Sequence, residues 1–197
     1  MLLKLKNVKK NYKINKNEVQ EVLKDINLTL KSGEFVCIYG ESGSGKSTLM
    51  NIIGGLEVPS AGRIEVDNKN LSELSEREMV QYRKKKIGFV WQKSGRNLFP
   101  YLTSLENIEA PMLAVGTTAK KRRARAEELL SLVGMEHKRD SYPSQMSGGE
   151  QQRIAIAVAL ANEPEILLAD EPTGAVDTKT SSQIQDLFRQ LNRKLGL

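Results

Sequence analysis

Short apolar runs separated by polar turn residues dominate the first ninety residues and return near residue 165, which predicts strands. The runs EFVCIY, IGFVW and EILLAD contain few polar residues, the pattern of strands buried in a parallel sheet. The segment GRIEVD instead alternates apolar and polar residues, as strands also do. Strands are therefore predicted over residues 2–8, 19–30, 34–39, 62–67, 87–91 and 165–170.

Apolar residues spaced three and four apart predict helices elsewhere. One helix is predicted from Lys46 to the glycine pair at 54–55, which stops it. Others are predicted over residues 104–115, 118–133, 148–160 and 179–195. The chain therefore reads as an α/β core, residues 1–91 and 163–197, interrupted by an α-helical subdomain, residues 92–162.

Composition and charge narrow the class of protein. A chain of 197 residues suits one compact domain, and no apolar run approaches the roughly 18 residues of a membrane span. The start lacks the apolar region of a signal peptide. The single cysteine, Cys37, is expected in the core and cannot form an internal disulfide, which fits a reducing, cytoplasmic compartment.

The net charge of +6 raises the question of a polyanionic partner. Basic residues cluster at 83–86 and 120–125, and the second cluster continues into Glu127 and Glu128, as on an ordinary solvated helix face. Anionic lipid headgroups or another polyanion remain the alternative. Because no aromatic residues are interleaved with these clusters, no nucleic-acid partner is expected.

Residues 40–47, GESGSGKS, fit the pattern G-x-x-x-x-G-K-[ST] at every fixed position. Glycines let successive backbone N–H groups turn toward a polyphosphate, and the helix that follows directs its positive end at the same anion. The lysine supplies charge for the β- and γ-phosphates, and the serine hydroxyl is an oxygen ligand for magnesium. A Gly/Ser-rich turn before a helix is the alternative, but strand, complete octet and helix together favour nucleotide binding. The expected loop comprises Gly40, Glu41, Ser42, Gly43, Ser44, Gly45, Lys46, Ser47 and Thr48.

Two acids follow the apolar run ILLA, at the end of a predicted parallel strand where ligands gather. Asp170 is the candidate for holding magnesium, and Glu171 for polarising the attacking water as general base. An acidic turn after a core strand is the alternative, and the complete phosphate loop upstream disfavours it.

The segment SGGEQQR, residues 147–153, lies between these two motifs and resembles the signature of the ATP-binding cassette (ABC) family. The resemblance covers nearly the whole chain and implies a P-loop NTPase (RecA-like) fold with N-terminal antiparallel strands. It implies that the signature binds the γ-phosphate held by a partner subunit. It also makes Tyr12 the adenine-stacking ring, Gln92 the glutamine that reaches magnesium, and residues 175–177 the loop that crosses the dimer interface.

Site roles follow from this resemblance together with the motifs. Lys46, Gln92 and Glu171 are the expected catalytic residues, and Ser47, Gln92 and Asp170 the expected magnesium ligands. Beyond the phosphate loop, the expected ATP-binding residues are Tyr12, Ser147, Gly148, Gly149, Glu150 and Asp177.

The implied function is that of an ATP-binding and ATP-hydrolysing transporter subunit, peripheral on the inner face of the cell membrane. Its expected partners are a second copy, in a head-to-tail dimer with ATP between the subunits, and a separate membrane permease. The segment DEPTGAVDTKT is most similar to the lipoprotein-release, macrolide-efflux and cell-division group. A soluble ABC ATPase of DNA repair or translation and a non-hydrolytic ATP-dependent clamp are the alternatives.

One departure concerns the family's switch histidine, which follows a strand located beyond the second carboxylate motif. The only histidine, His137, lies in the helical insert and is expected on the surface. The fold is therefore expected to be C-terminally truncated. For the same reason we expect the chain to bind ATP more readily than it turns it over.

Overall fold

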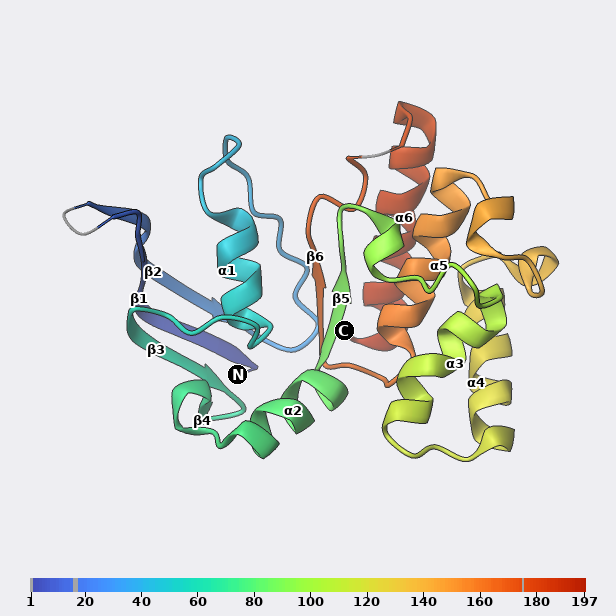
Figure 1. The fold of residues 1–197 in the computed structure, drawn as a ribbon, viewed down its shortest axis with the longest axis horizontal. Helices are drawn as coiled ribbons and strands as arrows, with labels where there is room; N and C mark the ends of the chain where they lie inside the picture. Colours follow the sequence, from blue (N-terminus) through green and yellow to red (C-terminus); the bar gives the residue numbers. More distant parts are fainter. Residues whose placement is uncertain (1, 16–17, 175) are drawn as a thin grey trace. The chain divides into compact units, whose positions relative to one another are not determined.

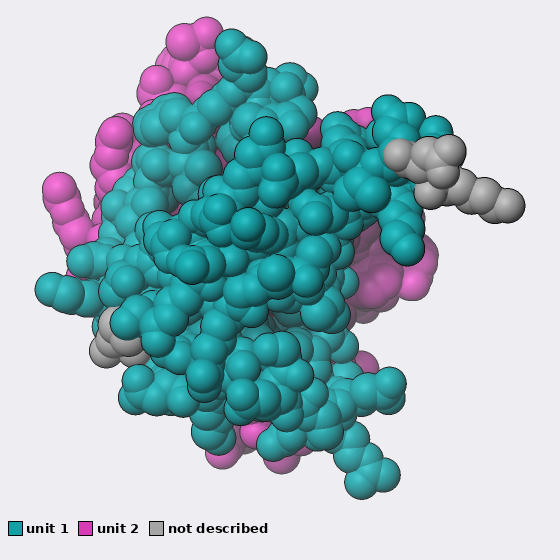
Figure 2. All heavy atoms as spheres, turned by 90° about the vertical axis from the view of Figure 1, so that its left-hand side faces the viewer, with its two compact units in different colours: residues 1–83, 196 teal, residues 84–195, 197 magenta. Residues whose placement is uncertain are grey.

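A computed structural model describes residues 2–15, 18–174 and 176–197. Contacts within the chain divide it into two compact units, residues 1–83 with 196 and residues 84–195 with 197 (Figure 2). The predicted division into core and helical insert stays a prediction, since these units cut the chain elsewhere. Each unit has its own sheet, and each is described by itself below.

The first unit is built on an antiparallel sheet with the strand order β2-β1-β3-β4. Antiparallel N-terminal strands are confirmed, although the first strand runs five residues beyond its predicted end at residue 8. The helix α1 begins at Lys46, as predicted, and buries Leu49, Ile52 and Ile53. The elements are β1 (Leu3–Lys13), β2 (Val19–Leu30), α1 (Lys46–Ile53), β3 (Ala61–Val66) and β4 (Lys69–Asn70) (Figure 1).

A helix that the apolar pattern did not predict, α2 (Glu76–Lys85), completes this unit after the 3-10 turn η1 (Leu71–Glu73). Ser75 and Glu78 cap its start reciprocally, since each side chain accepts the other's backbone N–H. The buried Tyr82 hydroxyl donates to the carbonyl of Ile53 at 2.7 Å. Burial, followed by the charge of Asp67, raises the pKa of Tyr82. This hydrogen bond ties α2 to the end of α1.

In the second unit, the described residues form four α-helices beside a two-stranded parallel sheet. β5 and β6 pair in register from Ile87↔Ile166 to Val90↔Ala169. The apolar faces of the helices form one core, in which Ile108, Leu129 and Ile154 are fully buried. The elements are β5 (Ile87–Val90), α3 (Ser104–Ala114), α4 (Ala119–Leu132), α5 (Gly148–Leu160), β6 (Ile166–Ala169) and α6 (Thr178–Leu195), with 3-10 turns η2 (Ser94–Arg96), η3 (Glu136–Lys138) and η4 (Pro143–Gln145).

The strand predicted over residues 34–39 is wrong. Within the described residues this segment pairs with no strand, and Phe35, Val36 and Tyr39 are exposed by 50%, 47% and 89%. Cys37, expected in the core, is also exposed. An apolar run becomes a buried strand only where neighbouring strands take up its N–H and C=O groups, and the run does not encode those neighbours.

Candidate nucleotide site

The phosphate loop has the backbone geometry that its glycines permit. Gly43 and Gly45 adopt left-handed φ angles of 80° and 91°. Gly45 also lacks space for a side chain, because a Cβ there would lie 2.9 Å from Leu23 Cδ2 and 3.0 Å from the carbonyl oxygen of Val22. At Gly40 a Cβ would lie 2.6 Å from the Ser44 hydroxyl oxygen. The glycines are thus needed for two different reasons, conformation and space.

The start of α1 is arranged for an anion. Its N-cap residue, Gly45, provides no side-chain cap, and the first turn of the helix contains no acidic residue. The first backbone N–H groups of a helix have no acceptor within it, and together with the helix dipole they favour an anion at this end. Lys46 folds back across the loop and donates to the carbonyl oxygens of Gly40 and Glu41, at 2.9 Å each. Ser47 and the side chain of Glu41 are exposed beside it.

The second unit brings predicted catalytic residues together at the carboxyl edge of β5 and β6. Asp170 follows β6 directly, and its N–H donates to the carbonyl of Val90 at 2.9 Å. The amide nitrogen of Gln92 donates to Oε2 of Glu171 at 2.8 Å. A Cβ at Gly174 would lie 3.2 Å from that amide nitrogen, so a glycine there leaves room for the Gln92 side chain.

Glu171 has an unusual backbone conformation for a residue with a side chain. Its φ is 45°, and its carbonyl accepts the N–H of Gly174 at 2.9 Å, which closes a tight turn. A non-glycine residue in this region costs about 1–3 kcal/mol, and such strain is concentrated at functional sites. The turn directs the Glu171 carboxylate toward Gln92.

Asn97 is a functional candidate whose role the sequence did not indicate. Its Oδ1 accepts the N–H of Trp91 at 3.0 Å, and its Nδ2 donates to the carbonyl of Phe89 at 2.6 Å. The amide of Gln152, on α5, donates to the Trp91 carbonyl at 3.5 Å. These contacts fix the backbone immediately before Gln92. In the sequence Asn97 is the fifth residue after that glutamine, and no local pattern marks these contacts.

The signature segment forms the capped start of α5, which begins at Gly148 as predicted. The Ser147 N–H donates to Oε2 of Glu150 at 2.8 Å, and the Glu150 N–H donates to the Ser147 hydroxyl at 3.3 Å. Lys138 also lies 3.4 Å from the Glu150 carboxylate. The backbone hydrogen bond from Ser147 lowers the pKa of Glu150; burial opposes this shift, and contacts with Ser147 and Lys138 add to it. Because two N–H groups serve the cap, those of Gly148 and Gly149 are the ones a phosphate would use.

Asp177 caps α6. Its Oδ1 accepts the Thr180 N–H at 3.0 Å and its Oδ2 accepts the Thr180 hydroxyl at 2.6 Å. Thr180 also limits the residue at 149, where a Cβ would lie 2.5 Å from Thr180 Cγ2. Asp177 therefore stabilises the start of α6. Ala175, in the predicted interface loop, lies outside the described residues.

Tyr12 lies on β1 with 36% of its surface exposed, and Oη donates to Glu57 at 2.5 Å. A ring in this position offers a partly open aromatic surface. Three other aromatic residues lie between β5 and α3 or directly after β5. Phe99 and Tyr101 are exposed by 48% and 70%, and Trp91 stacks on Phe89 with ring centroids 3.8 Å apart. His137 lies on the surface, as expected, with 63% of its side chain exposed.

The residues predicted to hold magnesium offer suitable oxygen atoms: the Ser47 hydroxyl, the Gln92 amide oxygen and the Asp170 carboxylate. The Gln92 amide nitrogen donates to Glu171, so the amide oxygen is not engaged in that hydrogen bond. Among the described residues no three His, Cys, Asp or Glu side chains cluster as a metal site. Mg²⁺ is usually bound through one or two carboxylates completed by phosphate oxygens and water.

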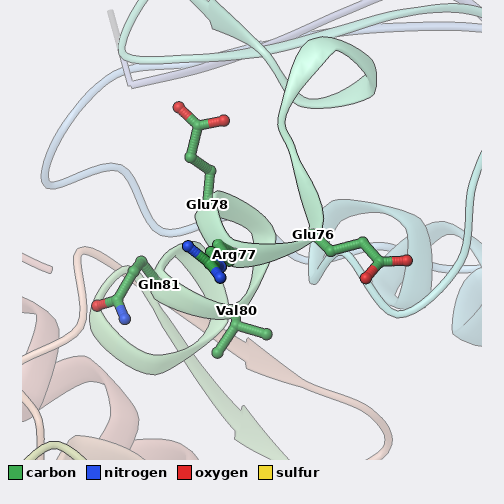
Figure 3. Close-up of a pocket in the computed structure, with 5 residues that line it drawn as sticks. All are labelled: Glu76, Arg77, Glu78, Val80 and Gln81. Carbon is green, nitrogen blue, oxygen red and sulfur yellow. The ribbon is translucent and has the colours of Figure 1, made fainter.

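A shallow hollow along α2 is unrelated to these residues. Its lining belongs to a single helix, and Figure 3 shows the side chains extending in different directions rather than converging. Such a surface does not resemble a ligand site, where polar groups converge. The lining residues are Glu76, Arg77, Glu78, Val80 and Gln81.

Comparison with known proteins agrees with the nucleotide site that this geometry indicates. The family model described as ABC transporter matches residues 23–174. The chain is 48% identical, over 99% of its length and 83% of the relative's, to an uncharacterised ABC transporter ATP-binding protein of Methanocaldococcus jannaschii. It is 44% identical, over 98% of its length and 78% of the relative's, to a lipoprotein-releasing system ATP-binding protein of Chlorobium chlorochromatii.

A solved structure extends the comparison to three dimensions. It is a dimeric ATP-binding cassette in a post-hydrolysis state bound to ADP and Pi. The chain matches it with a TM-score of 0.87 and 47% identity, over 99% of this chain and 84% of that one. Both the predicted fold class and the resemblance to the lipoprotein-release group are confirmed. Within the described residues, no helix has the length and apolar character required to traverse a bilayer.

Proposed function

Because the chain belongs to the ABC transporter family, in which it is an ATP-binding and ATP-hydrolysing subunit, we propose that it drives a separate membrane permease through the ATP-dependent pairing of two copies. The observation that carries this proposal is the start of α1. Gly45 provides no side-chain cap, the first turn of the helix contains no acidic residue, and the Lys46 ammonium lies across the loop before it. This arrangement suits a polyphosphate.

In the proposed site the triphosphate lies against the backbone N–H groups of residues 40–48, and Lys46 exchanges its carbonyl contacts for the β- and γ-phosphate oxygens. The ring of Tyr12 supports the adenine. Ser47, Gln92 and Asp170 are the residues that would hold Mg²⁺. A bound Mg²⁺ supplies charge neutralisation at the β- and γ-phosphates.

Glu171 is the proposed general base. Its carboxylate accepts a proton from the water that attacks the γ-phosphorus, and the bond to the β–γ bridging oxygen breaks to give ADP and phosphate. The hydrogen bond from Gln92 and the strained turn at Glu171 hold that carboxylate in one orientation. The preorganised carboxylate therefore does not have to be oriented during the reaction.

The proposed composite site is completed by a second copy. The N–H groups of Gly148 and Gly149, with the positive end of α5, bind the γ-phosphate held by the phosphate loop of the other subunit. The Ser147–Glu150 cap fixes the direction in which those groups point, and Asp177 caps α6 beside the proposed dimer interface. The dimeric relative with ADP and Pi supports this arrangement.

A permease partner is supported by the lipoprotein-releasing relative, and would place the chain on the cytoplasmic face of a membrane. The exposed Phe99 and Tyr101, between Gln92 and α3, are the proposed contacts with that partner. A soluble ABC ATPase of DNA repair or translation remains the alternative. Co-purification with a membrane protein supports the transporter reading, whereas salt-sensitive association with ribosomes or DNA supports the alternative.

The direct test of pairing uses Glu171→Gln, which keeps the shape of the side chain but removes the base. Light scattering should show that this variant dimerises when ATP and Mg²⁺ are added and remains dimeric. Lys46→Ala is the matched control and should stay monomeric at the same ATP concentration. The proposal fails if Glu171→Gln binds ATP yet remains monomeric at all protein concentrations.

A further inference from the structure

Four side chains form what we call the Glu57 cluster: Lys10 and Tyr12 on β1, Asn51 on α1, and Glu57 in the loop after α1. Oε2 of Glu57 accepts the Tyr12 hydroxyl at 2.5 Å and lies 3.4 Å from the Lys10 ammonium. Oε1 accepts the amide of Asn51 at 2.9 Å. One carboxylate therefore connects the strand that carries Tyr12 to the helix that follows the phosphate loop.

The backbone around Glu57 is fixed on the same helix. The N–H groups of Leu56 and Glu57 both donate to the carbonyl oxygen of Asn51, at 2.8 and 3.3 Å. The Lys10 ammonium also donates to the carbonyl of Val58 at 2.8 Å. The loop after α1 is thus held from both sides, and the carboxylate has little freedom to move relative to α1.

The Lys10 ammonium lies 5.0 Å from the centroid of the Tyr12 ring, within the range of a cation–π contact. One face of the ring therefore faces this cation, while 36% of the residue is still exposed. Only 15% of the Lys10 side chain and 28% of the Glu57 side chain are exposed, so the ion pair is partly withdrawn from water. The ring is accordingly held through its hydroxyl and contacted by a cation on one side, and part of its surface remains exposed.

The charge state of the cluster is consistent with this role. Burial raises the pKa of Glu57, but the hydrogen bonds from Tyr12, Asn51 and Lys10 outweigh it, and the net shift is downward. Burial and the hydrogen bond to Glu57 raise the pKa of Tyr12, and a hydrogen bond with Thr48 opposes them. At neutral pH the carboxylate is therefore an acceptor and the phenol a donor. Thr48 belongs to the phosphate loop, so the Tyr12 hydroxyl lies near that loop.

We propose that Glu57 is a positioning residue for base recognition: it sets the Tyr12 ring at a fixed place relative to α1, so that the site binds base and triphosphate together. The inference rests on the proposed role of Tyr12 as the support for adenine. Glu57 itself does not touch the nucleotide in this proposal. Without the Glu57 carboxylate, the Tyr12 ring loses its hydrogen-bond partner and the Lys10 cation loses its counter-ion. Stacking on a base would then cost more conformational entropy, because the ring would have to be immobilised on binding.

The test compares a ligand that has a base with one that has none. Affinities for ATP and for inorganic tripolyphosphate, each with Mg²⁺, are measured by calorimetry for the wild type, Glu57→Ala, Glu57→Gln and Tyr12→Phe. Glu57→Ala should weaken ATP binding about three- to tenfold, the effect of one or two lost hydrogen bonds, and leave tripolyphosphate within about twofold. Tyr12→Phe retains the ring without its tether and should change ATP binding in the same direction. Glu57→Gln should retain part of the ATP affinity, because its amide oxygen can still accept from Tyr12.

A double-mutant cycle and a matched control make the result specific. In a Tyr12→Ala background, Glu57→Ala should cause no further loss, because the ring through which it acts is absent. Glu65→Ala removes a carboxylate that pairs with Lys6 and Arg63 on the same sheet, at 3.4 and 3.0 Å, and should change neither affinity. Thermal melting of each variant confirms that it is folded.

The outcomes separate this inference from the proposed function. If Glu57→Ala binds ATP as the wild type does, or loses ATP and tripolyphosphate affinity equally, the positioning role is overturned. If the wild type itself binds ATP no better than tripolyphosphate, the role of Tyr12 as a base support fails, and this inference fails with it. Selective loss of ATP affinity in both Glu57→Ala and Tyr12→Phe supports the proposal.

Discussion

Gln92 and Glu171 are 79 positions apart in the sequence, yet Gln92 Nε2 lies 2.8 Å from Glu171 Oε2. The parallel register explains this contact. Val90 pairs with Ala169, and each of the two residues lies two positions beyond that pair. The carboxyl ends of both strands therefore deliver one amide and one carboxylate to the same point, where the amide can orient the proposed base.

Replacing Gln92 should lower the rate of ATP turnover. Gln92→Ala removes the donor to Glu171, and we expect kcat to fall at least about tenfold, the effect of losing one hydrogen bond to a charged group. Gln92→Glu replaces the donor with a second carboxylate whose charge repels that of Glu171, so kcat should fall further than in Gln92→Ala. The measurement is steady-state ATP hydrolysis at saturating ATP. Turnover in Gln92→Glu equal to that of the wild type would show that the two side chains do not interact during the reaction.

The contacts of Asn97 give a second prediction. Asn97→Ala removes both hydrogen bonds that fix the backbone on either side of residue 90, and Gln92 should become less ordered. We expect kcat to decrease about three- to tenfold while the affinity for ATP changes little. Asn97→Asp retains the acceptor for the Trp91 N–H and loses only the donor to Phe89, so it should lie between wild type and Asn97→Ala. Equal turnover in all three proteins would exclude a positioning role for Asn97.

Local signals predicted much of the fold and of the site. The helices that begin at Lys46 and Gly148 follow glycine and serine patterns that act within a few residues, and both begin where predicted. The run at 166–169 forms a strand because a neighbour exists in β5, whereas the equally apolar run at 34–39 has no strand neighbour among the described residues. Strand formation depends on distant partners, which periodicity does not specify.

Two kinds of feature are not predicted from the apolar pattern: one that has a local signal of another kind, and one that has no local signal. The apolar pattern does not predict α2, because the apolar stripe of this helix is sparse, although Ser75-x-x-Glu78 is a capping box. That signal was present and local. The roles of Asn97 and Glu57 were not accessible in this way, since each joins backbone or side chains that only the folded chain brings together. Polar side chains in loops have many potential partners, and the sequence does not rank them.

The cap of α5 predicts a pH-dependent contribution to stability. The pKa of Glu150 is lowered in the folded chain, so its contribution is fully present above the unfolded value of about 4.3 and is lost as the pH falls through the folded pKa. Glu150→Gln retains the cap but not the charge beside Lys138 and the helix start. The wild type should melt at a higher temperature than Glu150→Gln at pH 7, by a few degrees at most, since the pair is partly exposed. This difference should shrink below pH 4, and a constant difference from pH 7 to 3 would contradict the prediction.

The two glycines of the phosphate loop that have a positive φ allow two costs of a side chain to be compared: the strain of that φ and the steric overlap with neighbouring atoms. Gly43→Ala faces no atom within 4 Å, so its cost is that of the positive φ alone, about 1–2 kcal/mol of unfolding free energy. Gly45→Ala has the same conformational cost and also places a methyl group 2.9 Å from Leu23 Cδ2 and 3.0 Å from the Val22 carbonyl oxygen, which adds about 1–3 kcal/mol of overpacking. Urea denaturation should therefore rank the midpoints as wild type, Gly43→Ala and Gly45→Ala in descending order. Gly95→Ala, at a position without positive φ or near neighbours, is the control and should match the wild type.

Both loop variants should bind ATP more weakly than this control, because a change of either φ turns N–H groups away from the phosphates. If Gly45→Ala were as stable as Gly43→Ala, β2 would have to yield at Val22 and Leu23, and the close packing of the loop on that strand would not be what fixes its shape.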